Sequence, residues 1–409
     1  MLSPNNFLIF KSWWIQFPFH LKLITKIRFF ASFGAGGVIY LTSLVFNNIG
    51  LTATEIGLGF TISAIVGTLT RFGTGSYLNK KNKIHLPFVI SSIINIIAGC
   101  FLIISKDSFF YVIGQSLVGA AAGIYWPTAE FVIPFLSNPI DTRKAYTLVR
   151  SSEALGIFLG VFIGSFMNNF FYYKSIFFND IFCMLVIIIL ITRNKSSIQK
   201  KLVDYKKQSE DFSKNKQSSW NKNSLIIVLT LVLVTTSLAL IQVTLPLDLV
   251  KGGIFRKALD ENLISLLISL QLILLLFLQW PIGAWISKKG RLFGLKLTLI
   301  NFAFASLLLF ITSYLHNSAI YLILISIILI SLGTSSFLPT STDVVFNLAP
   351  SNKKGYALAL LSQCFAMGYF FGPFISGRVL DIFGYASVIW LSISIGCFLM
   401  CSAIYRKSF

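Results

Sequence analysis

The sequence predicts an all-α integral membrane protein, with twelve transmembrane helices arranged as two pseudo-symmetric six-helix bundles. Three observations carry this prediction: the composition, the number of long apolar segments, and a basic motif that occurs twice. The chain has 409 residues, of which 55% are hydrophobic and 12% charged, whereas about 25% of the residues of a soluble domain are charged. We therefore expect a bilayer, rather than water, to surround most of the chain.

The apolar segments match the thickness of a membrane. A helix crosses the hydrocarbon core with about 20 predominantly apolar residues, and twelve segments of the chain meet this requirement. They run over residues 29–50, 56–78, 86–104, 109–135, 146–168, 175–192, 224–246, 262–286, 292–314, 318–340, 356–377 and 385–404.

Polar stretches divide these segments into two sets of six. Residues 1–28 contain only short apolar runs without a cleavage pattern, so we expect an uncleaved cytoplasmic tail at the membrane interface. Residues 193–223 are polar and basic, which is typical of a solvated linker. The expected bundles therefore cover residues 29–192 and 224–409.

The basic residues predict the orientation in the membrane. Lysines and arginines near segment ends remain on the cytoplasmic side, and both termini are therefore expected there, in the cytoplasmic membrane of a bacterium. The loops on the opposite side hold only Lys106, Lys174, Lys251, Arg256, Lys257 and Arg378. The net charge of +20 thus reflects basic inner loops facing lipid headgroups, and we expect no nucleic-acid partner.

A short basic turn joins the second and third segments of each half. It reads GSYLNKKNK over residues 75–83 and GAWISKKGR over residues 283–291. Further along, "WPTAE" and "GIFLGVFIG" of the first half are followed in the same order by "LPTSTD" and "GYFFGPFISG" in the second. Shared landmarks in one order indicate a parallel internal repeat.

These features resemble the major facilitator superfamily, and the glycine patterns resemble its drug:proton antiporter branch. The resemblance covers essentially the whole chain and implies two bundles that rock about a central cavity, so that access alternates between the two membrane faces. The family usually places aspartate where this chain has Asn79 and Ser287. The cytoplasmic gate that the resemblance implies contains Gly75, Asn79, Lys80, Lys83, Glu130, Gly283, Lys288, Gly290, Arg291 and Asp343.

Two acidic residues have two interpretations. Glu130 and Asp343 end the fourth segment of each half, close to the basic turns. They are either helix-end charges in water or latches that pair with the turns, Glu130 with Lys80 or Lys83 and Asp343 with Lys288 or Arg291. Arg71, Asp248 and Asp381 lie near segment ends, where we expect them to anchor the chain or to reach the interface.

Glycines recur at four-residue spacing on one face of the fifth segment of each half. Such spacing allows helices to approach closely in lipid, and tight packing is the simplest interpretation. The second set also carries the proline of the antiporter pattern G-x-x-x-G-P-x-x-G. The helix-packing residues are Gly156, Gly160, Gly164, Gly368, Gly372 and Pro373.

Charges inside membrane segments are functional candidates, because each costs about 2.5–3.5 kcal/mol at the bilayer centre. Glu153 is the leading candidate, with Arg150 three residues earlier on the same helical face. The equivalent position in the second half is Gln363. Glu153 either carries a proton or is held by Arg150 as a brace, and the sequence does not separate these roles.

Polar and aromatic residues of the segments supply candidate lining for a substrate cavity. The candidates on the proton or substrate pathway are Glu153, Arg150, Gln363, Gln115, Tyr125, Trp126 and Gln271. Few charges and many aromatic groups suit a lipophilic or weakly cationic substrate better than an anionic one, which calls for clustered arginines.

Three classes of function are compared. The first is a secondary exporter of hydrophobic small molecules that exchanges them for protons, and the second is a nutrient importer or symporter on the same fold. The third, a receptor or a membrane enzyme, has less support, because the chain lacks the phosphate-binding motif G-x-x-x-x-G-K-[ST] and its three histidines are far apart. We expect a monomeric transporter, not an enzyme, with neither cofactor nor metal ion.

Overall fold

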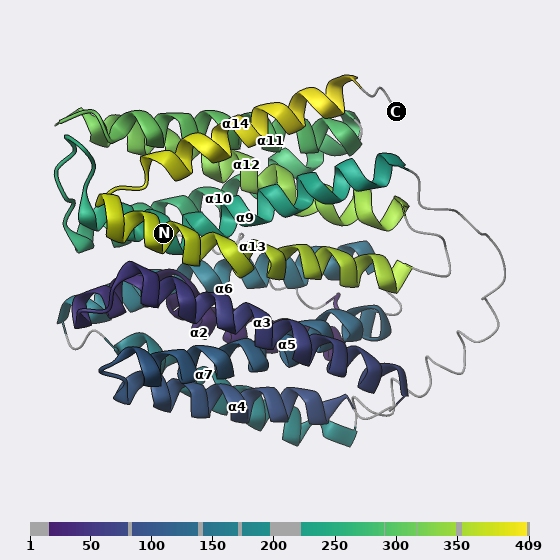
Figure 1. The fold of residues 1–409 in the computed structure, drawn as a ribbon. Coiled ribbons are helices and arrows are strands. Elements are labelled where there is room, and N and C mark those ends of the chain that lie inside the picture. The colour runs from purple at the N-terminus through teal and green to yellow at the C-terminus, as the bar shows by residue number, and fades with distance from the viewer. Residues whose placement is uncertain are drawn as a thin grey trace, which may run out of the picture.

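The computed structural model describes residues 16–80, 84–137, 142–170, 174–196, 222–289, 291–316, 318–348 and 354–406. These residues form twelve long helices that run roughly parallel to one another (Figure 1). The first half contains α2 (Phe19–Ile49), α3 (Ala53–Lys80), α4 (His85–Ile104), α5 (Ser108–Ser137), α6 (Thr142–Phe170) and α7 (Ser175–Arg193). The second half contains α9 (Lys222–Lys251), α10 (Glu261–Lys289), α11 (Arg291–Thr312), α12 (Ala319–Leu348), α13 (Lys354–Phe383) and α14 (Ser387–Arg406).

The helices have the length and the composition of membrane spans. Eleven of them contain an apolar stretch long enough to cross a bilayer; within the described residues, α13 does not. α13 nevertheless runs through the bundle beside α3 and α9. The all-α membrane fold is therefore confirmed, and the protein is an integral membrane protein with multiple spans.

The two halves repeat one packing scheme. In the first half α2 packs on α6, α3 on α5, and α4 on both α5 and α7. In the second half α9 packs on α13, α10 on α12, and α11 on both α12 and α14. These are the same neighbours at equivalent positions, as a parallel repeat predicts. Figure 1 shows the first half below the second, with α13 and α6 near the boundary between them.

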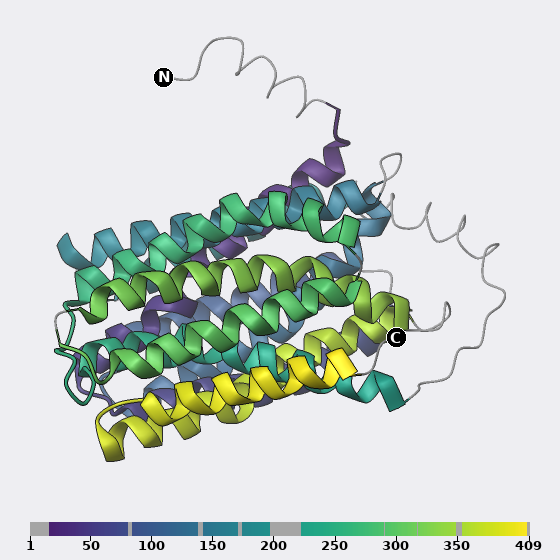
Figure 2. The same ribbon diagram turned by 90° about the horizontal axis from the view of Figure 1, so that it is seen from above.

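The halves meet mainly where α3 packs on α13, α6 on α10 and α2 on α9, and α2 also contacts α10. α2 begins and α14 ends at the same end of the molecule, which we call the terminal end (right in Figures 1 and 2). The opposite end, called the far end, carries the connections from α2 to α3, α9 to α10 and α13 to α14. Because each helix reverses the direction of the preceding one, residues from distant parts of the sequence meet at each end.

The first helix starts earlier than the sequence predicted. α2 begins at Phe19, directly after Pro18, whereas the tail was expected to extend to residue 28. The short, broken apolar runs of this stretch suggested a tail on the membrane interface, but Leu21 and Ile27 are fully buried and pack with residues of other helices. The buried face of the first turns therefore makes them part of the bundle, and this brings Arg28 inside it.

Candidate functional site

Four charged side chains from three helices form a cluster inside the first half. Arg28 Nη2 donates hydrogen bonds to Glu130 Oε1 at 3.0 Å and to Glu153 Oε2 at 2.8 Å. Arg150 Nη2 lies 3.0 Å from Glu130 Oε1, and its Nη1 donates to Glu153 Oε2 at 3.0 Å. Each guanidinium therefore bridges both carboxylates, and the four formal charges cancel. We call these four residues the charge cluster.

Close packing of α2 on α6 positions this cluster. Glu153 lies on α6, three residues before Gly156, and a Cβ atom added at Gly156 would lie 2.6 Å from the carbonyl oxygen of Phe29 on α2. A larger residue at this position would hold the two helices apart. The glycine therefore allows Arg28, the neighbour of Phe29, to reach the carboxylate of Glu153.

Exposure to solvent increases steadily across the charge cluster. The exposed fraction of the side chain is 1% for Arg28, 16% for Glu153, 31% for Glu130 and 43% for Arg150. Arg28 lies about 13 Å along α2 from its first residue, at 1.5 Å per residue. Arg150 and Glu130 therefore form the exposed side of the cluster, and Arg28 forms its buried end.

Aromatic side chains of α5 cover the buried end of the cluster. The guanidinium carbon of Arg28 lies 4.1 Å from the centre of the Trp126 ring, within the range of a cation–π contact. The hydroxyl of Tyr125 donates to the carbonyl oxygen of Ile27 at 3.4 Å. Arg28 Nη1 has no hydrogen-bond partner within the described part of the chain. Trp126 and Tyr125, both predicted as pathway residues, thus hold Arg28 and the helix that carries it.

Polar contacts join the two halves near the terminal end. Arg71 Nη1 on α3 donates to the carbonyl oxygen of Ser362 on α13 at 2.8 Å. The neighbouring residue Gln363 has its Nε2 at 3.4 Å from Thr68 Oγ1. Arg71 was expected to anchor its helix or to reach the membrane interface; instead it contacts the other half. Gln363, the counterpart of Glu153 in the repeat, lies at the interface between the halves.

The remaining predicted lining residues are separated from one another. Gln115 on α5 is 1% exposed, and its Nε2 has no partner among the described atoms. Gln271 on α10 is 5% exposed, and its main-chain oxygen accepts a hydrogen bond from Ser331. Neither residue takes part in the polar contact that joins α9 to α2, in which Gln242 Nε2 donates to the hydroxyl of Tyr40 at 3.1 Å.

A carboxylate closes the interface at the far end. Asp381 near the end of α13 accepts hydrogen bonds from the main-chain nitrogens of Ala53 at 3.1 Å and Thr54 at 2.7 Å, the first two residues of α3. It also accepts from Thr54 Oγ1 at 2.6 Å, and Lys251 Nζ lies 2.7 Å away. Asp381 therefore caps a helix of the other half, and we call this group of four residues the Asp381 latch.

Sequence reasoning missed a buried carboxyl group in the first half. Asp180 on α7 is 4% exposed and accepts a hydrogen bond from Asn95 Nδ2 at 2.6 Å. Its second oxygen contacts Gly34 and has no hydrogen-bond partner in the described part of the chain. The available signal was an aspartate in the middle of the apolar segment 175–192.

A second buried aspartate stabilises the far end of the second half. Asp248 is fully buried and pairs with the equally buried Arg256 at 2.9 Å. It also accepts from the main-chain nitrogen of Ala386 and from Trp390 Nε1. Asp248 was expected to reach the interface, but this pair ties the loop after α9 to α14.

Several predicted gate residues lie outside the described side chains. This applies to Asn79, Lys80, Lys83, Lys288, Gly290, Arg291 and Asp343. Glu130, proposed as a partner of Lys80 or Lys83, contacts Arg28 and Arg150. A Cβ atom at Gly75 or Gly283 would meet no atom within 4 Å, so the two turns are equally open at these positions. Within the described residues no group of three histidine, cysteine or acidic side chains is placed to hold a metal ion.

Comparison with known proteins decides the family. The model of the Major Facilitator Superfamily matches residues 27–253 and, in a second copy, residues 227–407. The chain belongs to the major facilitator superfamily. As a member of this superfamily it is a transporter, and the two matches together cover residues 27–407.

Two curated relatives of this superfamily member differ in the length they share with it. An uncharacterized MFS-type transporter of Methanocaldococcus jannaschii, MJ1560, is 24% identical over 389 residues, which cover 87% of this chain and 89% of the relative. The transcription regulatory protein OpdE of Pseudomonas aeruginosa is 22% identical over 139 residues, so the match spans only 34% of either protein.

Solved structures with low sequence identity share the fold of this superfamily member. The nucleoside transporter NupG has a TM-score of 0.71 at 16% identity, with 94% of this chain and 98% of that one covered. A POT family transporter in complex with 5-aminolevulinic acid has a TM-score of 0.77 at 12% identity, with 96% of each chain covered. These similarities establish the architecture and leave the substrate to be argued from the site.

Proposed function

We propose that this protein is a proton-coupled secondary exporter that carries hydrophobic or weakly cationic small molecules by alternating access, with the charge cluster as its coupling site. The terminal end then faces the cytoplasm, in agreement with the distribution of basic residues. The observation that carries the proposal is the pair of glutamates that share two arginines within the membrane-spanning part of the first half.

The geometry supports coupling because protonation of one carboxylate changes the partners of both arginines. Glu153 Oε2 accepts from Arg28 Nε and Nη2 and from Arg150 Nη1. A proton on Glu153 removes the charge that holds these donors, and Glu130, which already contacts both guanidiniums, then retains them. Since Arg28 lies on α2 and Arg150 on α6, proton binding alters the force between two packed helices.

The alternative role of Glu153 is that of a brace. Breaking a buried ion pair leaves an unpaired charge and costs about 3–5 kcal/mol, so a permanently ionised Glu153 also stabilises the contact of α2 with α6. A brace and a proton carrier differ in one respect. The carrier must titrate during transport, whereas the brace only has to support the fold.

The contacts between the halves support alternating access. At the far end Asp381 on α13 bonds to α3, and Asn48 on α2 donates to Glu261 on α10 at 2.6 Å. Toward the terminal end Arg71 bonds to the carbonyl oxygen of Ser362. These are separate polar contacts on the two sides of one interface, and a rocking motion breaks one set while it preserves the other.

The electrostatics of the cluster support a substrate without strong negative charge. Both arginines are matched by glutamates, so neither guanidinium is left to balance a phosphate or a carboxylate. The spacing of Gly368, Gly372 and Pro373 also resembles the antiporter pattern. The second candidate is uptake of a metabolite by symport. It draws on the shared fold with a nucleoside transporter and POT family transporters, and the same cluster can couple either direction.

Transport by purified protein in vesicles with an imposed pH difference tests the proposal. We would compare the wild type with Glu153→Gln, using a fluorescent lipophilic cation and radiolabelled uridine as probes. If Glu153 carries the coupling proton, the variant exchanges the probe across the membrane but no longer concentrates it. Asp107→Asn, which alters an exposed acid at the far end of the same half, should behave as the wild type.

Each outcome separates the candidates. Accumulation of the cation against its gradient, driven by protons moving in the opposite direction, supports export. Proton-driven accumulation of uridine in the direction of proton flow supports uptake instead. Full gradient-driven transport by folded Glu153→Gln protein, together with a lower unfolding temperature, would show that Glu153 is a brace and would refute the coupling role.

A further inference from the structure

We infer that the groove between the terminal ends of α11 and α14 is a binding site for one anionic phospholipid, with the lipid phosphate on Lys296 and an acyl chain in the groove. The groove lies on the outer surface of the second half, away from the charge cluster. It lies on the part of the surface that the bilayer covers, so its occupant must have the chemistry of a lipid.

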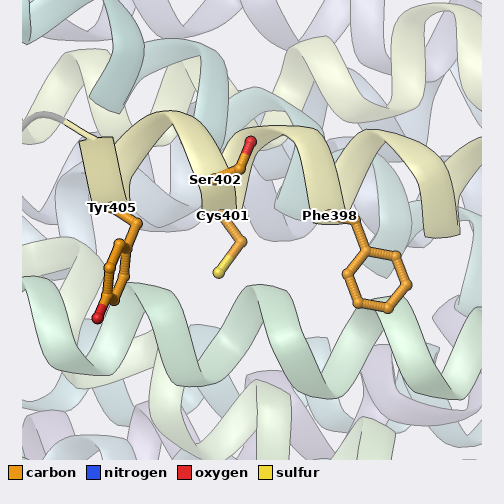
Figure 3. Close-up of a pocket in the computed structure, with 4 residues that line it drawn as sticks. All are labelled: Phe398, Cys401, Ser402 and Tyr405. Atoms are coloured by element: carbon orange, nitrogen blue, oxygen red, sulfur yellow. The ribbon is translucent and has the colours of Figure 1, made fainter.

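A hollow of about 340 Å³ opens along the last turns of α14. It is lined by Phe398, Cys401, Ser402 and Tyr405, which follow one face of the helix at spacings of three and four residues. Figure 3 shows Phe398, Cys401 and Tyr405 pointing from α14 toward the neighbouring helix, with Ser402 beside Cys401. The lining is mainly carbon, as a site for a hydrocarbon chain requires.

α11 forms the other side of the groove and also presents apolar groups. The ring of Phe304 meets that of Phe398 edge to face, with the ring centres 5.4 Å apart. Phe304 is 47% exposed, Ile300 one turn earlier is 40% exposed, and Phe398 is 40% exposed. These exposed side chains form an apolar surface along the direction of the helices, which is the direction of an acyl chain in a bilayer.

A cation lies at the headgroup end of this apolar surface. Lys296, in the second turn of α11, has its Nζ 4.6 Å from the centre of the Tyr405 ring. Its ammonium contacts no carboxylate within the described residues. Tyr405 is 76% exposed in the last turn of α14, where aromatic residues of membrane proteins meet the headgroups. An unpaired ammonium at this depth matches a lipid phosphate.

The charge of this end favours an anionic lipid over a neutral one. Exposed basic residues at the terminal end of the described chain include Lys26, Arg193 and Lys195. The free ammonium and its basic surroundings attract a headgroup with net negative charge, and each lysine near such a surface contributes about 1 kcal/mol. Loss of the Lys296 charge should therefore weaken anionic lipid binding about fivefold.

Lipid retention by the purified full-length protein tests the site. The protein is exchanged into micelles that contain either phosphatidylglycerol or phosphatidylcholine, and bound lipid is counted by native mass spectrometry over a titration. Lys296→Gln should lower the affinity for the tightest phosphatidylglycerol about fivefold and leave phosphatidylcholine unchanged. Lys289→Gln is the matched control, because Lys289 is exposed at the same end and its Nζ also lies near a ring, 5.9 Å from the centre of Phe293.

A second variant tests the acyl part of the site independently. Ser402→Phe fills the hollow and leaves Lys296 in place, so it should also displace the tightest phosphatidylglycerol. If both Lys296→Gln and Ser402→Phe retain phosphatidylglycerol as the wild type does, the site does not exist. Equal affinity of the wild type for phosphatidylcholine would show an apolar surface without headgroup recognition and would overturn the inference as well.

Discussion

Removal of the Asp381 carboxylate should shift the protein toward states that are open at the far end. In the closed interface Asp381 accepts from the main-chain nitrogens of Ala53 and Thr54, which have no acceptor inside α3. The next nitrogen, that of Glu55, is bonded to Thr52 Oγ1 within the same half and stays satisfied in any state. Separation of α3 from α13 therefore leaves the nitrogens of Ala53 and Thr54 without the acceptor that Asp381 supplies.

The size of the shift follows from the value of a helix cap. Replacing a capping side chain by alanine costs about 0.5–2 kcal/mol. The bridge between Asp381 and Lys251 joins two helices of the same half, α13 and α9, so it does not oppose opening. A loss of about 1–2 kcal/mol corresponds to a change of about 5–30-fold in the ratio of open to closed molecules.

Distances between spin labels on the two halves measure this ratio. One label replaces Ile104, which is exposed at the end of α4, and the other replaces Lys257, which is exposed in the loop after α9. Cys100, also exposed, is changed to serine to prevent its labelling. In Asp381→Ala the longer, open distances should increase at the expense of the shorter ones.

Asp107→Ala is the matched control for this experiment. Asp107 caps α5 by accepting from the main-chain nitrogen of Phe110 at 2.9 Å, and both residues belong to the first half. This variant should lose stability through the missing cap but keep the wild-type distances. If Asp381→Ala leaves the distribution of distances unchanged, or changes it no more than Asp107→Ala does, the latch is a local cap without a role in opening.

Three further predictions concern the interior of the first half. Arg28→Met should lower the free energy of unfolding in micelles by about 3–5 kcal/mol, because two glutamates then share one guanidinium. Adding Glu153→Gln to this variant should restore part of the lost stability, and purely additive losses would contradict a shared cluster. Gly160→Ala should lower the free energy of unfolding by about 1–3 kcal/mol, since the added Cβ atom meets the carbonyl oxygen of the facing turn of α2. Gly283→Ala, in open space, should leave the unfolding temperature unchanged, and equal effects of the two variants would contradict the packing argument. Asp180→Asn should unfold at the same temperature as the wild type or a higher one, because the carboxyl group has no cation partner among the described residues; a marked decrease would show that its charge is required.

The sequence predicted the secondary structure of this protein well because the bilayer imposes a simple rule. Each span needs a long apolar helix with its main-chain hydrogen bonds satisfied internally. Such a helix can be recognised in the sequence as a long run of apolar residues. The same reliance on composition placed the predicted start of the first helix too late. Short apolar runs, broken by Pro18 and Lys22, suggested a tail on the membrane interface, and only the packing of Leu21 and Ile27 against other helices shows that these turns are inside.

Part of the charge cluster was also present in local sequence. Arg150 and Glu153 are three residues apart on one helix, so their contact follows from helical geometry. The glycine at position 156 indicated that another helix approaches closely at this point. Neither pattern identifies the approaching helix. α2 has glycines of its own at this contact, Gly36 against Ile157 and Gly37 against Gly160, but other segments also contain glycines, so small residues alone do not show which helices pair.

Tertiary structure alone decided which distant charges complete the cluster and the latch. Arg28 is 125 positions from Glu153 and 102 positions from Glu130, and Asp381 is 327 positions from Thr54. Such pairs depend on which helices become neighbours and at what height, and no periodicity of a single segment contains this information. The sequence by itself therefore determined that helices cross the membrane and that two halves are related. The packing of α2 against α6, and of α3 against α13, determined where their charges meet, because a buried charge is stable only beside a partner that the fold brings to it.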